Sequence, residues 1–137
     1  MQDHFHELYG RWNGEGQLYH YTVEKIAPYS VKAVIWYQGE SDTSIAEAEV
    51  YDQELAMMID CWREVFRNEE MPFVVIQIAD YIERTDAAWK RLQQAQWDAQ
   101  FLRENVKTII CRDVCEDDNI HPASKKQLAE RIAASLQ

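Results

Sequence analysis

Asp118 and His121 give the sharpest chemical signal in the chain, in the string Asp118-Asn119-Ile120-His121-Pro122. An aspartate three residues before a histidine, on a turn entering a helix, can place its carboxylate against one imidazole nitrogen. The other nitrogen is then oriented to act as a base. Asp-x-x-His also occurs at ordinary capped helix starts, so the spacing alone is weak evidence for a catalytic pair. Of the four histidines, His121 alone lies outside the first 20 residues, and this favours a functional role.

A second polar group follows the apolar run 31–37 and consists of Gln38, Gly39 and Glu40. A buried strand that ends in a glycine and polar side chains is how open α/β sheets build sites. Ser41 follows directly, but a nucleophile elbow requires Gly-x-Ser-x-Gly and the second glycine is missing here. We therefore predict that Ser41 organises the loop or helps to cap the next helix, and is not a nucleophile.

The elements that position these residues alternate along the chain. Apolar runs at 31–37, 73–79 and 106–111 predict three strands, and each is followed by a helical pattern. The helices are expected at 44–66, 87–104 and from Pro122 onward, with a short one at 18–26. Each long helix has one apolar face that is predicted to be buried. These faces are Tyr51, Leu55, Met58, Ile59, Trp62 and Phe66 in the first, Trp89, Leu92, Ala95, Gln96, Ala99 and Leu102 in the second, and Leu128, Ala129, Ile132, Ala133 and Leu136 in the last. Ser44 with Glu47 forms a capping-box pattern, and Asp86 is placed to cap the second long helix.

Such alternation predicts an α/β fold with a parallel sheet, right-handed crossovers and helices on its faces. The carboxyl ends of the strands then meet at one edge, where such folds bind ligands. Residues 1–17 show no convincing period and are predicted to be loop. With 137 residues, we expect a single domain spanning 1–137.

The charge balance excludes some classes of partner. The formal net charge is −10, from 24 acidic and 14 basic residues. Nucleic acids and anionic membranes need clustered lysine and arginine, so we expect neither as a partner. No apolar run approaches the roughly 18 residues of a membrane span. The first residues show no signal-peptide pattern, and the compartment stays unassigned.

The three cysteines, Cys61, Cys111 and Cys115, cannot all pair within one chain. Cys61 and Cys111 fall on apolar patterns and are predicted to be small core residues. Cys111, Cys115 and His121 could in principle bind zinc, but their spacing matches no common zinc motif. We expect no metal site and no cofactor.

Several of these strings together resemble the sialate O-acetylesterase family, within the SGNH (GDSL-like) carbohydrate esterases. They are APYSVKAVIWYQGESD, Cys61-Trp62-Arg63, PFVVIQIAD, WKRLQQAQ from Trp89 and DNIHP. The similarity runs from about Leu18 to the C-terminus. It implies a flavodoxin-like three-layer α/β/α fold and a serine esterase that removes O-acetyl groups from sialic acid or a related sugar.

The resemblance also implies roles for individual residues. His121 matches the general base and Asp118 its acidic partner, while Glu40 is a second candidate for orienting the histidine. Gln38 and Gly39 match the block that borders the oxyanion site. The sequence does not decide between Asp118 and Glu40.

One family feature has no counterpart here. Family members carry the nucleophilic serine in a Gly-x-Ser block before the WYQGES strand, and none of Gly10, Gly14 and Gly16 is followed by a serine. We therefore expect a domain truncated at its N-terminus, the C-terminal portion of an esterase. Alone it should be weakly active or inactive, because acyl-enzyme chemistry needs the nucleophile.

The missing first strand leads to a prediction about association. The strand at 31–37 would present an open apolar edge, which favours a homodimer paired through that edge. The alternative is that residues 1–17 fold back and cover it. For function, the alternative is a non-catalytic carbohydrate-binding or interaction module of the same fold, with Trp36, Tyr37 and Trp89 as sugar-stacking surface.

Overall fold

The computed structural model describes residue 14 and residues 16–137. Two short helices, α2 (Gln17–Tyr21) and α3 (Val23–Ile26), precede the first strand, β1 (Val34–Trp36). Then α4 (Ile45–Val65), β2 (Phe73–Ile76), α5 (Ala87–Asp98), the 3-10 turn η1 (Ala99–Phe101), β3 (Val106–Ile109) and α6 (Lys126–Ser135) follow. The predicted strands and helices are thus confirmed in order and type, and the predicted loop over residues 1–17 lies largely outside the described residues.

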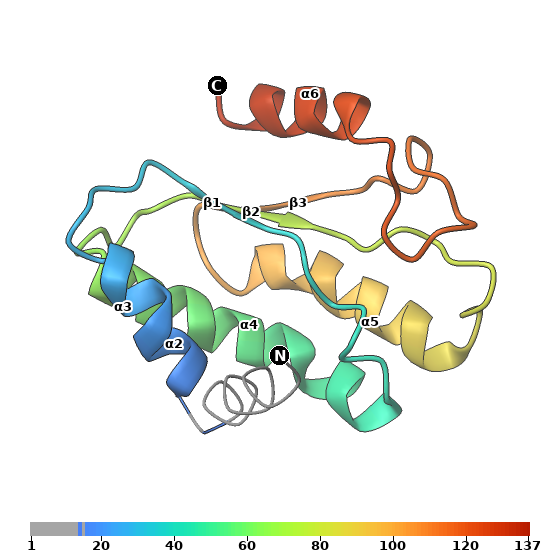
Figure 1. Cartoon of the computed structure of the whole chain (residues 1–137), viewed down its shortest axis with the longest axis horizontal. Helices are drawn as coiled ribbons and strands as arrows, with labels where there is room; N and C mark the ends of the chain where they lie inside the picture. Colours follow the sequence, from blue (N-terminus) through green and yellow to red (C-terminus); the bar gives the residue numbers. More distant parts are fainter. Residues whose placement is uncertain (1–13, 15) are drawn as a thin grey trace, which may run out of the picture.

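The three strands form one parallel sheet in the order β1-β2-β3. Both crossovers, from β1 to β2 and from β2 to β3, move across the sheet in the same direction. Because parallel crossovers are right-handed, their helices, α4 and α5, lie on the same face of the sheet. Figure 1 shows α4 and α5 on that face, with α2 and α3 beside α4, and α6 on the opposite face. The three-layer α/β/α architecture predicted from the sequence is confirmed.

The long helices begin where the capping residues predict. Ser44 Oγ accepts from the Glu47 amide at 3.3 Å, and the Ser44 amide donates to the Glu47 carboxylate at 3.1 Å, which completes the capping box. Asp86 caps α5 by accepting from the Trp89 amide at 3.1 Å. These side chains satisfy amide groups that a first helical turn leaves without partners.

The core on the α4 and α5 face joins the three strands to both helices. Its fully buried members include Ile59 of α4, Leu92 and Ala95 of α5, and Val75 of β2. Cys61 was predicted in this core, but it is exposed. It follows Ile59 by two residues, and two residues rotate a helical side chain by about 200°, onto the outer face.

Several predicted boundaries are too long. The ladders cover only three or four residues of each strand. The helix expected at 87–104 ends in η1, and Leu102, predicted to be buried, is 40% exposed. The final helix begins at Lys126 rather than near Pro122, and only Leu128 of its expected inner face is buried; Ile132 is partly buried and Ala129, Ala133 and Leu136 are exposed.

None of the helices in the described part of the chain has the length and apolar character needed to cross a bilayer. Within those same residues, no group of three His, Cys, Asp or Glu side chains is placed to hold a metal ion.

Candidate functional site

The loop after β1 holds Gln38, Gly39 and Glu40 at the carboxyl end of the sheet. Gly39 has a φ of 151°, which side chains rarely adopt. A Cβ built there would lie 2.7 Å from Gln96 Nε2 and 3.3 Å from atoms of Ile78 and Leu92. Glycine at this position therefore lets the loop pass close to α5.

Gln96 of α5 joins the ends of β1 and β2. Its Oε1 accepts from the Ile78 amide at 2.8 Å, and its Nε2 donates to the Gln38 carbonyl at 2.8 Å. Both backbone groups lie just beyond the β1–β2 ladder, and Gln96 is fully buried. One side-chain amide thus spans the gap between the separating strands and holds the site loop against the core.

Tyr51 of α4 holds the same loop from the other helix. Its hydroxyl accepts from Trp36 Nε1 at 3.1 Å and lies 3.0 Å from the Gln38 carbonyl, to which it donates. Burial raises the pKa of Tyr51, so the hydroxyl keeps the proton that it donates. The Gln38 side chain is also engaged, because its Nε2 donates to Asp42 Oδ2 at 2.5 Å.

His121 lies across from this loop, on the segment between β3 and α6. Its Nδ1 is 3.8 Å from Glu40 Oε1, an ion-pair distance when the imidazole is protonated. The Glu40 side chain is 17% exposed and that of His121 is 77% exposed. The pairing with Glu40 leaves Nε2 as the nitrogen that is free of this contact.

Asp118 occupies a different position from the one that the Asp-x-x-His string suggests. It is exposed, and no ion pair within 4.0 Å joins it to His121 in the described chain. The turn is instead closed by Asn119, whose Oδ1 accepts from the His121 amide at 2.9 Å. Of the two carboxylates that the sequence left open, the structure brings Glu40 to the imidazole and leaves Asp118 apart from it.

The His121 segment is organised by Glu116, which sequence reasoning did not single out. Its carboxylate accepts from the amides of Ala123 at 2.6 Å and Ser124 at 3.1 Å. Hydrogen bonds from its own amide, from Ser124 and from Ala123 lower the pKa of Glu116 to about 2. These bonds fix the residues that immediately precede α6 against the loop that carries Glu116.

Two further contacts fasten this segment to the sheet. Arg131 of α6 donates to Asp113 Oδ1 at 2.7 Å and to the Ile110 carbonyl at 2.8 Å, and it lowers the pKa of Asp113 to about 2. Lys125 Nζ lies 4.5 Å from the centroid of the Tyr37 ring at the end of β1. Burial, followed by the nearby Cys111 thiol, raises the pKa of Tyr37.

Sequence reasoning placed Gln96 on the inner face of α5 but did not predict its bonds to two strand ends. The one available signal was a pair of glutamines, Gln93 and Gln96, at helical spacing among Leu92 and Ala95. Amide side chains on an apolar helical face must find partners in the core. The identity of those partners depends on strand ends distant in the sequence.

The comparisons with known proteins agree with this architecture. The family model for carbohydrate esterase, sialic acid-specific acetylesterase, matches residues 7–137. The chain therefore belongs to this carbohydrate esterase family, and the resemblance noted from the sequence is confirmed.

The curated relatives share less than a third of their aligned residues with this chain and are longer than it. Sialate O-acetylesterase of Homo sapiens is 22% identical over 133 residues, covering 84% of this chain and 25% of that protein. A probable carbohydrate esterase of Arabidopsis thaliana is 28% identical over 106 residues, covering 72% of this chain and 36% of that protein. The chain thus spans about a quarter of the length of the sialate O-acetylesterases that it matches.

Solved structures share the fold. A carbohydrate acetylesterase from Xanthomonas citri superposes with a TM-score of 0.74 at 28% identity, over 80% of this chain and 26% of that one. An Arabidopsis thaliana protein superposes with a TM-score of 0.64 at 22% identity, over 92% of this chain and 53% of that one. The fold expected from the resemblance is confirmed.

Proposed function

We propose that this chain provides the acid–base half of a carbohydrate O-acetylesterase site, acting on acetylated sialic acid or a related sugar. The observation that carries the proposal is the approach of His121 Nδ1 to Glu40 Oε1, at 3.8 Å, beside the Gln38–Gly39 turn. The family membership supports the reaction class, and the names of the relatives support the acetylated-sugar substrate.

In the proposed mechanism, His121 Nε2 removes the proton of a serine hydroxyl as that oxygen attacks the acetyl carbonyl. Glu40 faces Nδ1, holds the ring and stabilises the imidazolium that forms. The imidazolium then returns the proton to the departing sugar oxygen. A distance of 3.8 Å is longer than a hydrogen bond, and catalytic contacts of free enzymes often shorten only in the complex with substrate.

Gln38 and Gly39 are proposed to border the oxyanion site. The Gln38 side chain is already bonded to Asp42 and the Gln38 carbonyl to Gln96. The role is therefore assigned to the positions of the loop atoms around Gly39, which the core contacts preorganise. The serine is proposed to come from a segment preceding the strand of the WYQGES block.

The test requires a polypeptide that combines this chain with a Gly-x-Ser segment. We expect His121→Ala to lower kcat/KM for p-nitrophenyl acetate by roughly three orders of magnitude or more. Glu40→Gln should lower kcat strongly with little change in KM, whereas Asp118→Asn should have a small effect. Full activity of the His121→Ala variant would refute the proposed base, and a larger loss in Asp118→Asn would transfer the orienting role to Asp118.

The second candidate function, a non-catalytic carbohydrate-binding module, was based on Trp36, Tyr37 and Trp89. Trp89 is 2% exposed, and its indole donates to the Ala79 carbonyl at 3.1 Å. Trp36 packs edge-on against Trp62 with ring centroids 5.9 Å apart, and Lys125 lies over Tyr37. These rings contribute to packing, so the esterase role is the better supported of the two.

For association, we propose a homodimer that pairs through β1. Among the described strands, β1 contacts only β2, and Ile35 on β1 is 53% exposed. Exposed strand edges pair readily with other chains. Size-exclusion chromatography with light scattering should give a dimer for the parent chain and a monomer for Ile35→Lys. A parent chain that stays monomeric at high concentration would exclude this pairing.

A further inference from the structure

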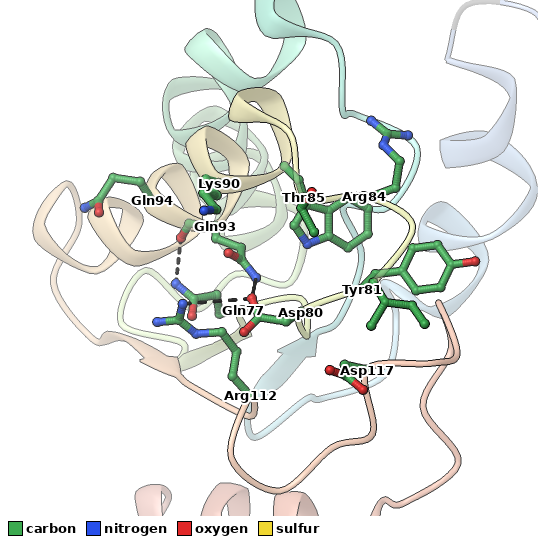
Figure 2. Close-up of a pocket in the computed structure, with 12 residues that line it drawn as sticks. Gln77, Asp80, Tyr81, Arg84, Thr85, Lys90, Gln93, Gln94, Arg112 and Asp117 are labelled. Atoms are coloured by element: carbon green, nitrogen blue, oxygen red, sulfur yellow. Dashed lines mark hydrogen bonds and ion pairs between the residues drawn. The ribbon is translucent and has the colours of Figure 1, made fainter.

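A polar pocket with a volume of about 580 Å³ opens at the carboxyl end of β2. Its walls come from the loop after β2, the first turns of α5 and the loop after β3 (Figure 2). None of Gln38, Glu40 and His121 lines it. The pocket is therefore separate from the proposed acid–base pair, although both lie at the carboxyl end of the sheet.

The pocket contains a buried hydrogen-bond acceptor that has no partner among the described residues. Gln77 is 4% exposed, and its Oε1 makes no hydrogen bond within the part of the chain that the structure describes. The orientation of the amide follows from chemistry, because Nε2 lies 2.7 Å from the Gln93 backbone carbonyl, which can only accept. The oxygen must therefore face away from α5, and a buried acceptor of this kind requires a donor.

Neighbouring contacts hold Gln77 in place. The Gln93 side-chain Nε2 donates to the Ile78 carbonyl at 3.0 Å and to Asp80 Oδ1 at 3.0 Å. Cys111 Sγ donates to the Gln77 carbonyl at 3.2 Å. The Gln93 amide and the Cys111 thiol are therefore already engaged with other acceptors, and neither donates to Gln77 Oε1. A ligand hydroxyl can supply the missing donor.

The rim of the pocket offers donors and acceptors together. Figure 2 shows the side chains of Gln77, Asp80 and Arg112 converging on one part of the pocket. Arg112 lies 4.0 Å from Asp80, and Arg84, at the far end, lies 2.9 Å from Asp86. Both guanidinium groups face carboxylates, and the other two charged side chains of the lining, Lys90 and Asp117, have opposite signs, so charge does not select an anion here. A hydroxyl group, which both donates and accepts, matches this mixture.

Part of the wall is apolar. Tyr81 and Ile82 line the pocket, and Ile82 is 59% exposed. The Ile82 amide also donates to the Asp117 carbonyl at 2.9 Å, which joins this wall to the loop that continues to His121. A ring with polar edges and a C–H face fits such a lining.

We propose that this pocket binds the ring of a neutral sugar, with a ring hydroxyl donating to Gln77 Oε1 and others bonding to Asp80 and Arg112. The site is a subsite for the glycan that carries the ester, and in this respect it rests on the proposed function. It assigns the sugar a position separate from the reacting ester and linked to it through the loop that holds Asp117 and His121.

The experiment is a ¹H–¹⁵N NMR titration of the 137-residue chain with methyl β-galactopyranoside, myo-inositol and sodium acetate. We expect the galactoside to shift the side-chain amide signal of Gln77 and the signals of Asp80 and Arg112. Arg112→Gln and Asp80→Ala change exposed rim residues and should each weaken binding by about tenfold, the effect of one good hydrogen bond to a charged group. Lys126→Gln removes an exposed charge on α6, outside the pocket lining, and is the matched control; it should bind the galactoside as the parent does.

Two results would overturn the inference: no shift at Gln77 with the galactoside, or shifts at these residues with acetate alone. A response to inositol equal to that of the galactoside would show a general site for polyols and overturn the assignment to a sugar. The acetylesterase assay is independent of this titration. Galactoside binding without esterase activity would sustain the subsite and refute the proposed function, and activity without binding would do the reverse.

Discussion

The two sides of the candidate site are held by different kinds of contact. The Gln38–Glu40 loop is held from the face of the sheet that α4 and α5 cover, where buried Gln96 and Tyr51 bond to the backbone of the loop. The His121 segment is held mainly by exposed charged groups, with Glu116 and the Asp113–Arg131 pair beside a single helix, α6. One side is therefore part of the core, and the other depends on surface electrostatics.

This difference implies that one side of the candidate site is preorganised by the core, whereas the other side can adjust its position. Buried polar bonds in a low-dielectric core fix the loop that would surround a developing charge. Solvent-exposed ionic bonds are weakened by salt and by changes in pH, so the segment with the proposed base, His121, can move with less effect on the fold. Variants on the two sides should consequently differ in size and in kind.

The largest contrast is expected between core leucines on the two faces. Leu92→Ala, in the α5 core, should lower the free energy of unfolding by about 4 kcal/mol, and Leu128→Ala, under α6, by about 2 kcal/mol. Both residues are nearly fully buried, but the thin layer over Leu128 can relax into the space. Urea denaturation followed by circular dichroism measures both. Equal losses would mean that α6 is as firmly packed as α5.

The next effect concerns the amide that joins the strand ends. Gln96→Leu leaves the Ile78 amide and the Gln38 carbonyl without partners, which should cost roughly 3 kcal/mol of stability. Gln94→Leu is the matched control on the same helix, because Gln94 is exposed and bonds only to Asp98 among the described residues. It should change stability by less than about 0.5 kcal/mol. Similar losses in thermal melts of the two variants would contradict the role of Gln96.

A smaller loss is expected at the turn itself. Gly39→Ala combines a φ of 151° with a Cβ 2.7 Å from Gln96 Nε2, and should cost about 2 kcal/mol. Gly16 has a φ of 69°, but among the described residues a Cβ there meets nothing closer than 3.8 Å, so Gly16→Ala should cost about 1 kcal/mol. The difference between the two melting curves isolates the close approach to α5. No difference would remove that contact from the explanation.

The smallest effect is local and depends on pH. The pKa of Glu116 is lowered from 4.5 to about 2 and that of Asp113 from 3.8 to about 2 in the folded chain. A lowered folded pKa means that the stabilisation is complete above the unfolded value and is lost as pH falls toward 2. We therefore expect the Ala123 and Ser124 amides to lose protection progressively below about pH 4.5, before the core unfolds.

Hydrogen exchange of these amides, followed by NMR from pH 6 to pH 2.5, measures the effect after correction for intrinsic exchange rates. Glu116→Gln is the control. In this variant the Ala123 and Ser124 amides should already be less protected at pH 6, and their protection should change little at lower pH because no carboxylate at position 116 titrates. Protection that remains constant in the parent chain down to pH 2.5 would show that Glu116 does not hold the segment.

The sequence by itself determined the element order, the parallel α/β class, both long-helix caps and the family, because these depend on local patterns. Periodicity identified Ile59 and Leu92 as core residues, and Ser44 and Asp86 act within one turn of their positions. The wrong burial predictions also came from local patterns. Cys61 and Leu102 are apolar residues whose exposure depends on which neighbour covers that side of the helix.

Only the tertiary structure decided how the candidate site is held. Sequence proximity paired His121 with Asp118, whereas the fold brings Glu40, some 80 residues earlier, to the imidazole and leaves Asp118 in solvent. The bonds of Gln96 to two strand ends likewise depend on groups that are distant along the chain. So does the position of Gln77 Oε1, which has no hydrogen-bond partner in the described part of the chain. Short-range spacing determines which side chains can act, but the packing of strands and helices determines which of them meet.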